Sequence, residues 1–434
     1  TFFLHTSFTV SKDGGTGTST YFYDHLRLLD FYAYGNIKTL AKKITFDNSM
    51  LIYLNNTTNN ANNPNENYAR EFLELFTILK GPQITEGNYT NYTELDIQQA
   101  AKVFSGIKVQ YDRSIIDPDT NLPKGRIAVG NHDTTNKTFS SAFDNQTITG
   151  GNSEETIINE LDSFVEMIFE KEATAKSFCR KLYRFYVKSE ITDEIENDII
   201  VPLASTFRSN YNLQEVLDQL LLSQHFYDLD DSDNSDELIG GLIKSPLDLV
   251  LQTLNIVEYP VPDPITHGLD HYKHFYQWQM VLAVMDPAGQ HPFWPPSVVG
   301  FPANYESPDF DKFWFNSSTI ITRYNMASIL ANKNSTKVYD WYVSTFVKNN
   351  VSNPANPTTL VSELVAIMFP EAVSADRLNY FVNVILLDNG SLDASMWADD
   401  WTDYVNNPSN TTAVEAALKP LFEALTWSQE YQNN

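Results

Sequence analysis

Apolar residues that recur every three to four positions dominate this sequence, and this helical spacing most constrains what the chain can fold into. The clearest example is NPNENYAREFLELFTIL, residues 63–79. At 100° per residue, its charged side chains fall with Asn67 and Thr77 within one sector of about 140°, while apolar side chains fill most of the remaining surface. A helix with so broad an apolar face needs partners, so the spacing predicts a mainly α-helical protein with a large core.

The same spacing recurs along the whole chain, whereas strand patterns are few. The predicted helices cover residues 21–34, 36–46, 65–80, 94–105, 154–170, 172–187, 213–223, 245–256, 272–284, 318–332, 335–348, 359–368, 374–386 and 412–425. The stretch 106–150 has β-branched pieces between turn residues, which predicts a small hairpin or a long irregular excursion. The expected fold is therefore one large multi-helix domain with a small irregular or β excursion around 106–150.

Two of these helices carry recognisable start signals. For the helix over 65–80, Asn63 is a good N-cap, Pro64 suits the first turn, and Glu66 stands where a capping box needs it. For the helix over 154–170, Ser153 is a plausible N-cap. Both starts are predicted from local chemistry alone.

The acidic stretch DLDDSDNSDE, residues 228–237, is the clearest breakpoint in the chain. Its alternating carboxylates suggest a calcium loop, but counting from Asp231 the turn position holds Asp236 instead of Gly, and the twelfth position holds Leu242 instead of Glu. A solvated acidic linker is the preferred interpretation. It separates an N-terminal helical half, 1–227, from a C-terminal half, 238–434, of the same large domain.

Composition narrows the class of protein. The chain has 434 residues, of which 42% are hydrophobic, and a net charge of −26, which opposes binding to nucleic acid or to an anionic membrane. No stretch approaches the roughly 18 to 20 apolar residues of a membrane span. The only cysteine, Cys179, excludes an internal disulfide and is expected to be a buried structural thiol.

The polar, lysine-poor, acidic surface favours a secreted or cell-surface location. Sequons of the form Asn-x-Ser/Thr would be glycan sites in a eukaryotic secreted protein and a mere compositional feature in a bacterial one. They occur at Asn55, Asn56, Asn88, Asn91, Asn136, Asn145, Asn316, Asn334, Asn350, Asn389 and Asn410. The chain begins without Met and within an expected element, which suggests a processed or truncated product.

Several ordered segments carry a family resemblance. They are FLHTSFTV at 3–10, LIYLNN at 51–56, PNENYAREFLELFTI at 64–78, YTELDIQQAAKVFSG at 92–106, NHD at 131–133 with Lys137, KSPLDLV at 244–250, WPPSVVGFP at 294–302, TRYNMASIL at 322–330 and WSQEYQ at 427–432. Together they resemble the bacterial domain-of-unknown-function family 1800 over nearly the whole chain. The resemblance implies an exported protein, further helices before Thr1, and an exported partner of domain-of-unknown-function family 1501.

The sequence departs from the family pattern at four places. Ser7 replaces a histidine, Asn55 replaces an aspartate, and Ile107 and Phe301 replace tryptophans. The first two changes remove a histidine and a carboxylate that a metal or acid–base site would use.

The best candidate site joins the polar face of the 65–80 helix to the long excursion. Its residues are His5, Glu66, Asn67, Arg70, Glu71, Glu74, His132 and Asp133. If the excursion covers the helix, Glu66 and Glu74 would hold Arg70, and burial would raise the pKa of a carboxyl such as Glu71 for proton transfer. His132 would supply a base. The alternatives are a buried salt-bridge network without chemistry and a simple solvated face.

A second candidate is HGLDHYKH, where His267, His271 and His274 stand at i, i+4 and i+7. On a helix they would share one face and could bind zinc or copper. Pro264 and Gly268 weaken a helix there, so surface histidines are the preferred interpretation and no metal is assigned.

The residues assign no cofactor. Nucleophile elbows, phosphate-binding glycine loops and zinc-protease motifs are absent from the sequence. Two classes of function remain: a surface-associated structural or binding component that assembles with itself or a partner, and an exported enzyme, such as a hydrolase, that uses the candidate site. The altered family positions favour the first.

Overall fold

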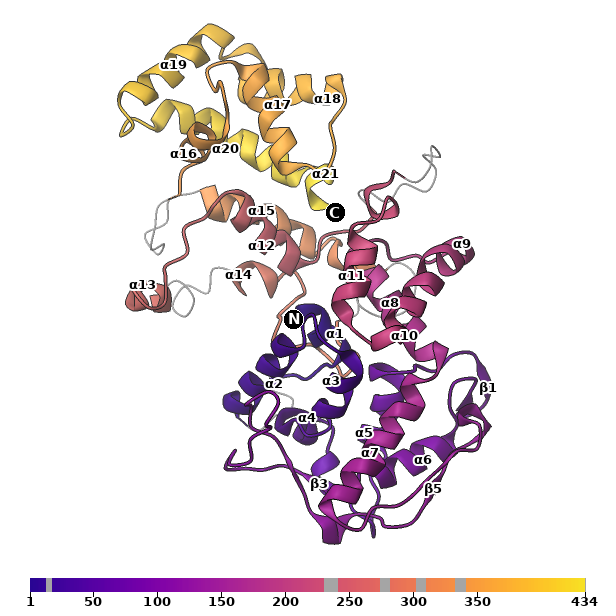
Figure 1. Cartoon of the computed structure of the whole chain (residues 1–434). Coiled ribbons are helices and arrows are strands. Elements are labelled where there is room, and N and C mark those ends of the chain that lie inside the picture. The colour runs from indigo at the N-terminus through magenta and orange to yellow at the C-terminus, as the bar shows by residue number, and fades with distance from the viewer. Residues whose placement is uncertain (13–17, 230–240, 274–281, 302–309, 332–340, 434) are drawn as a thin grey trace. The chain divides into compact units, whose positions relative to one another are not determined.

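The computed structural model describes the chain except for residues 13–17, 230–240, 274–281, 302–309, 332–340 and 434. It divides into two compact units (Figure 1). Unit 1 comprises residues 1–231 and 293–308, and unit 2 comprises residues 232–292 and 309–434. The fold is mainly α-helical with small antiparallel sheets, as the periodicity predicts. In the described part of the chain, no helix has the length and hydropathy needed to cross a membrane.

Unit 1 is built from helices around an aromatic core. Its helices are α1 (Phe2–Ser7), α2 (Ser19–Phe31), α3 (Ile37–Ile44), α4 (Asn48–Tyr53), α5 (Asn67–Glu71), α6 (Glu94–Val103), α7 (Glu154–Phe169), α8 (Glu172–Tyr186), α9 (Asp193–Ile195), α10 (Val201–Asn210) and α11 (Leu213–Leu221). Phe104, after α6, has its ring centroid 4.7 Å from that of Tyr68 on α5 and 5.3 Å from that of Phe164 on α7. Cys179, on α8, is buried as predicted, and burial raises its pKa well above the usual thiol range.

The predicted start of the 65–80 helix is wrong. Helix α5 begins at Asn67, and Asn63 instead pairs with Asn60 in a tight turn. The side chain of Asn65 accepts the Asn67 N–H at 3.0 Å, so an asparagine turn replaces the expected capping box. After Glu71 the helix continues as a π-helix, Phe72–Phe76, and the Thr77 hydroxyl donates to the Phe72 carbonyl at 2.6 Å. The segment therefore ends before residue 80.

The excursion contains two short antiparallel pairs, as expected for a small β element. Strand β3 (Ile107–Lys108) pairs with β4 (Arg126–Ile127), and β5 (Lys137–Thr138) pairs with β6 (Thr147–Ile148). A third pair, β1 (Gln83–Thr85) with β2 (Asn88–Tyr89), precedes α6. The excursion packs into the core through Phe139, whose ring stacks 5.5 Å from that of Phe164 on α7.

Unit 2 is a helical bundle with its own core. Its helices are α12 (Pro246–Ile256), α13 (Gly268–Tyr272), α14 (Leu282–Met285), α15 (Thr319–Ala331), α16 (Val343–Asn350), α17 (Pro357–Met368), α18 (Ala375–Asn379), α19 (Ala394–Asn406), α20 (Thr412–Trp427) and α21 (Gln429–Gln432), with a π-helix at Tyr380–Leu386. Helix α20 packs on α15, α16, α19 and the π-helix. The predicted acidic linker 228–237 lies outside the described residues from position 230 onward, as do parts of the predicted helices 272–284 and 335–348.

Candidate functional site

Arg70 is the centre of the polar face on α5, and its main partner comes from another helix. Its Nη2 lies 2.7 Å from Oε1 of Glu94 and its Nη1 lies 3.3 Å from Oε2, a two-pronged pair between α5 and α6. The predicted partners Glu66 and Glu74 are more distant, at 3.5 and 3.6 Å. Sequence spacing identified the i, i+4 carboxylates but could not show that Glu94 would be the closer one.

Glu74 is held from two sides. The Tyr92 hydroxyl donates to its Oε1 at 2.7 Å, and the Lys80 ammonium lies 3.0 Å from its Oε2. Burial, followed by the hydrogen bond to Glu74, raises the pKa of Tyr92. Glu74 therefore serves as an acceptor that joins the end of the 65–80 segment to the chain before α6.

Glu71 differs from its neighbours because it is half-buried and, within the described part of the chain, forms no hydrogen bond or ion pair. Burial, and then the charge of Glu74, raises its pKa to about 7. Asn67 is used structurally: its side-chain amide donates to the Leu54 carbonyl at 3.1 Å. Glu71 thus has a pKa that suits proton transfer at neutral pH.

His132 and Asp133 belong to a different, buried network. The His132 Nε2 lies 2.9 Å from Oε2 of Glu160 on α7, and the Lys137 Nζ lies 2.8 Å from Oε1 of the same carboxylate. The side chains of all three residues are fully buried. The Gly151 N–H also donates to Glu160, at 2.6 Å. This network ties the excursion to α7.

The excursion is anchored to α6 by a second set of contacts. The Asp133 N–H donates to the Ser105 hydroxyl at 2.8 Å, and His132 Nδ1 lies 2.8 Å from the Ser105 carbonyl oxygen. The Lys137 ammonium donates to the Asp133 carbonyl. Within the described residues, no hydrogen bond or ion pair joins His132 or Asp133 to the carboxylates of the α5 face. The structure therefore places the two halves of the predicted site in separate networks.

His5 lies in a third place. It is buried, and its ring centroid is 6.0 Å from that of His25 on α2. His25 Nδ1 in turn lies 3.1 Å from Oδ1 of Asp47, the residue that caps α4. Sequence reasoning missed His25 and Asp47 because neither stands in a recognisable motif.

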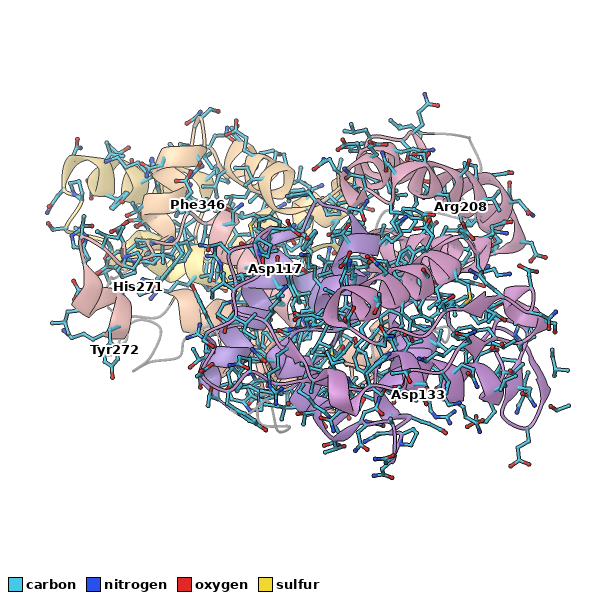
Figure 2. The ribbon with its side chains drawn as sticks, turned by 60° about the horizontal axis from the view of Figure 1, so that its bottom comes forward. Asp117, Asp133, Arg208, His271, Tyr272 and Phe346 are labelled. Carbon is cyan, nitrogen blue, oxygen red and sulfur yellow. The ribbon has the colours of Figure 1, made fainter. Side chains whose placement is uncertain are left out.

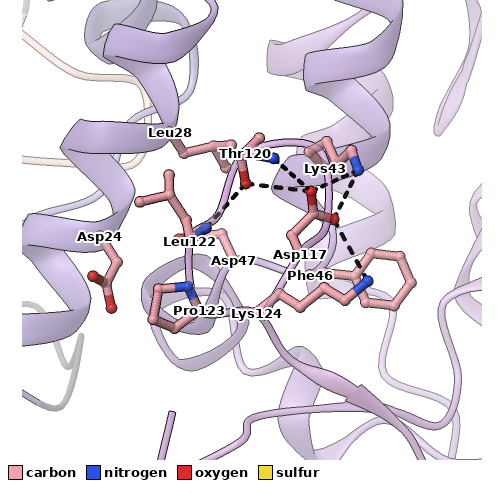
Figure 3. Close-up of a pocket in the computed structure, with 10 residues that line it drawn as sticks. All are labelled: Asp24, Leu28, Lys43, Phe46, Asp47, Asp117, Thr120, Leu122, Pro123 and Lys124. Atoms are coloured by element: carbon pink, nitrogen blue, oxygen red, sulfur yellow. Dashed lines mark hydrogen bonds and ion pairs between the residues drawn. The ribbon is translucent and has the colours of Figure 1, made fainter. Parts of the chain in front are cut away.

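Asp117 in the excursion forms a further charged cluster, drawn in Figure 3. Its Oδ2 lies 2.7 Å from the Lys43 ammonium and 3.5 Å from that of Lys124, and its Oδ1 accepts the Thr120 N–H at 3.1 Å. The adjoining pocket has a volume of about 20 Å³, which is room for a single water molecule. This cluster fastens the excursion to α3.

The candidate metal histidines lie partly outside the described residues. His271 sits on α13 beside Tyr272 (Figure 2), and its Nδ1 is 2.8 Å from the Pro262 carbonyl oxygen. His267 Nδ1 is 2.9 Å from the Thr266 hydroxyl, and His274 is not among the described positions. Elsewhere in the described ranges, no group of three or more His, Cys, Asp or Glu side chains could hold a metal ion.

The chain matches the family described as Protein of unknown function (DUF1800) over residues 1–432. The protein therefore belongs to this family, as the ordered motifs predict. Comparison with curated proteins and with solved structures gave no match.

Proposed function

We propose that the protein is an exported, surface-associated binding or assembly component. The observation that carries this proposal is that two residues of the predicted site are committed to internal pairs, His132 with Glu160 and Arg70 with Glu94. A buried carboxylate that two cationic or imidazole groups hold on both oxygens is a brace for the fold. The acidic, sequon-rich composition supports export.

An exposed aromatic face on α2 supports the binding role. Tyr23 and Phe31 are 57% and 55% exposed, and they lie eight residues apart on one side of the helix. Tyr34, just after the helix, is 64% exposed, and Tyr111, next to Tyr21, is 72% exposed. Tyrosine and phenylalanine are enriched in protein interfaces, so these exposed rings on and near α2 are candidates for a contact surface.

The partners proposed for this face are a second copy of the chain or an exported protein of domain-of-unknown-function family 1501. The test measures self-association of the full chain by light scattering and its affinity for a co-expressed family 1501 protein by calorimetry. We expect the double variant Tyr23→Ser, Phe31→Ser to weaken association at least about tenfold, since aromatic anchors carry most interface energy. Ile84→Ser, an equally exposed change on β1, should leave it unchanged. A chain that stays monomeric and does not bind the family 1501 protein would contradict the proposed contact surface. Recovery of the native chain in the cytoplasmic fraction would contradict export.

One observation favours a second candidate, an exported enzyme such as a hydrolase on the Glu66/Arg70/Glu71/Glu74 face. Glu71 titrates near neutrality beside the cation Arg70, which suits general acid–base catalysis. His132 and Asp133, which the same hypothesis included, bond elsewhere. A screen of glycoside, ester and phosphoester substrates should show turnover that Glu71→Gln abolishes and that Glu155→Gln, an exposed change on α7, retains. Turnover that survives Glu71→Gln would exclude this role.

A further inference from the structure

Segments far apart in the sequence meet in unit 2 around the start of α12. The guanidinium of Arg323, on α15, donates from Nε to Oε1 of Gln432 at 2.8 Å and from Nη1 to the Lys244 carbonyl at 2.9 Å. The Lys244 ammonium donates to the Tyr431 carbonyl at 2.7 Å. Gln290 joins the same region, because its Oε1 accepts the Leu247 N–H at 2.7 Å. Three of the family motifs therefore converge on one buried cluster.

The cluster contains two cations without a matching anion. Lys244 and Arg323 are 2% and 1% exposed, and no carboxylate of the described residues lies within ion-pair distance of either. Buried charges are costly and are normally paired. Burial lowers the pKa of Lys244 to about 8 and that of Arg323 to about 10, and the charge of Arg323 adds to the effect on Lys244. The folded state thus holds two buried cations whose charge is not balanced by a neighbouring carboxylate.

Other groups nearby compensate only in part. Asp248 contributes a favourable charge to Lys244, but its carboxyl accepts the Ser245 hydroxyl at 2.6 Å and burial raises its pKa. The Lys244 ammonium lies 4.4 Å from the Tyr431 ring centroid, and the Arg323 guanidinium lies 5.6 Å from that of Phe315. Cation–π contacts offset some desolvation but supply no full countercharge.

Two buried N–H donor groups in the cluster have no acceptor among the described residues. Arg323 Nη2 and Gln290 Nε2 have no hydrogen-bond partner within the described part of the chain, although both side chains are fully buried. Unsatisfied buried donors in a native fold require a ligand or another explanation. They stand beside the N-terminus of α12, an eleven-residue helix whose dipole adds positive potential at that end.

We propose that Arg323, Gln290 and Lys244 form a binding site for a small oxyanion. The anion would accept from Arg323 Nη2 and Gln290 Nε2, and Lys244 would contribute its charge through the low-dielectric surroundings. Phosphate, sulfate and a carboxylate all present the required oxygen acceptors. This site is independent of the proposed α2 contact surface.

The test measures thermal unfolding of the full chain in phosphate, sulfate or acetate against chloride, at equal ionic strength and neutral pH, with calorimetric titration of each anion. We expect at least one oxyanion to raise the Tm by about 5 °C at saturation, while chloride does not. The ranking of the three separates tetrahedral anions from carboxylates. Equal Tm values in all four salts, with no heat of binding, would overturn the proposal.

Gln290→Glu is the decisive variant, because it builds a carboxylate in place of the leftover amide donor. It should raise the Tm in chloride and remove the response to oxyanions. Arg377→Gln, which breaks a part-exposed pair with Glu430 in the same unit, is the matched control and should keep the response. Arg323→Gln should also lose the rise in Tm with oxyanions. Circular dichroism of each variant shows whether it folds. An oxyanion response that persists in Gln290→Glu would place the binding elsewhere.

Discussion

Glu160 is the residue on which the buried network of unit 1 depends, because one carboxylate holds both His132 and Lys137. Removing its charge leaves the fully buried Lys137 with only the more distant carboxylate of Asp133, 3.8 Å away, as a countercharge. We therefore predict that Glu160→Gln lowers the free energy of unfolding by about 3–5 kcal/mol. Chemical denaturation followed by circular dichroism measures this.

Glu166→Gln, on the same helix, is the control for that prediction. Glu166 pairs with Lys38 at 2.7 Å but its side chain is 51% exposed, so the change should cost less than about 1 kcal/mol. Equal losses in the two variants would show that Glu160 is not a brace.

Glu71 predicts a pH dependence of stability. Its pKa is raised to about 7 in the folded protein from an ordinary value of 4.5, so the folded state holds its proton more tightly than the unfolded state. The stabilisation is complete below pH 4.5 and is lost as the pH rises through about 7.

Glu71→Gln should remove this loss and stabilise the protein above pH 7 by about 1 kcal/mol, a figure reduced for solvent screening. Urea denaturation at about pH 5 and about pH 8 compares the variant with the parent and with Glu66→Gln. A parent whose stability does not fall between these values would contradict the assignment.

At the scale of the element, helices with long apolar stripes could be predicted from the sequence. The first residue of a helix that follows several asparagines could not. The prediction of 154–170 matches α7, Glu154–Phe169, within one residue at its end. The start of α5 was misplaced because the side chains of Asn60 and Asn65, and not that of Asn63, accept the local backbone N–H groups, while all three residue positions suit a turn. The π-helix after Glu71 has no sequence signature.

The cap of α7 gives an element-scale prediction. The Ser153 hydroxyl accepts the Thr156 N–H at 3.3 Å, and the Thr156 hydroxyl accepts the Ser153 N–H at 2.9 Å. Ser153→Ala should lower the free energy of unfolding by about 1 kcal/mol. Ser163→Ala, in the exposed middle of the same helix, should have no such effect, because its hydroxyl only bonds back to the Asn159 carbonyl. Thermal unfolding of both variants tests the difference.

At the scale of the whole molecule, the sequence indicated individual charged residues of the buried networks but did not predict how they pair across helices. His132, Arg70 and Glu94 all lie in segments that carry the family resemblance, but Glu160 does not. The pairing of Arg70 with Glu94 and of His132 with Glu160 could not be predicted, because the partner depends on which helices pack together. Lys244 and Tyr431 stand 187 positions apart in the chain and meet only in the folded unit. The aromatic and apolar positions of the core follow a period, whereas charge pairing across helices does not.

The C-terminal segment should hold unit 2 together. Deleting residues 428–434 removes the carbonyl of Tyr431 from Lys244 and the amide of Gln432 from Arg323. We predict faster amide hydrogen exchange in α12 and α15, with no change in α7 of unit 1. Uniform acceleration across both units would mean that the segment supports the molecule as a whole.

The division of the chain has a consequence for biosynthesis. Residues 293–308 return to unit 1 after residues 232–292 have entered unit 2. The Lys12 N–H donates to the Phe293 carbonyl at 2.9 Å, the ring of Phe293 packs edge-on against that of Phe22 at 5.7 Å, and Trp294 lies over the Lys12 ammonium. On the ribosome, the N-terminal unit therefore stays unfinished until a stretch of the second unit has already emerged, so the two must complete their folding as overlapping events.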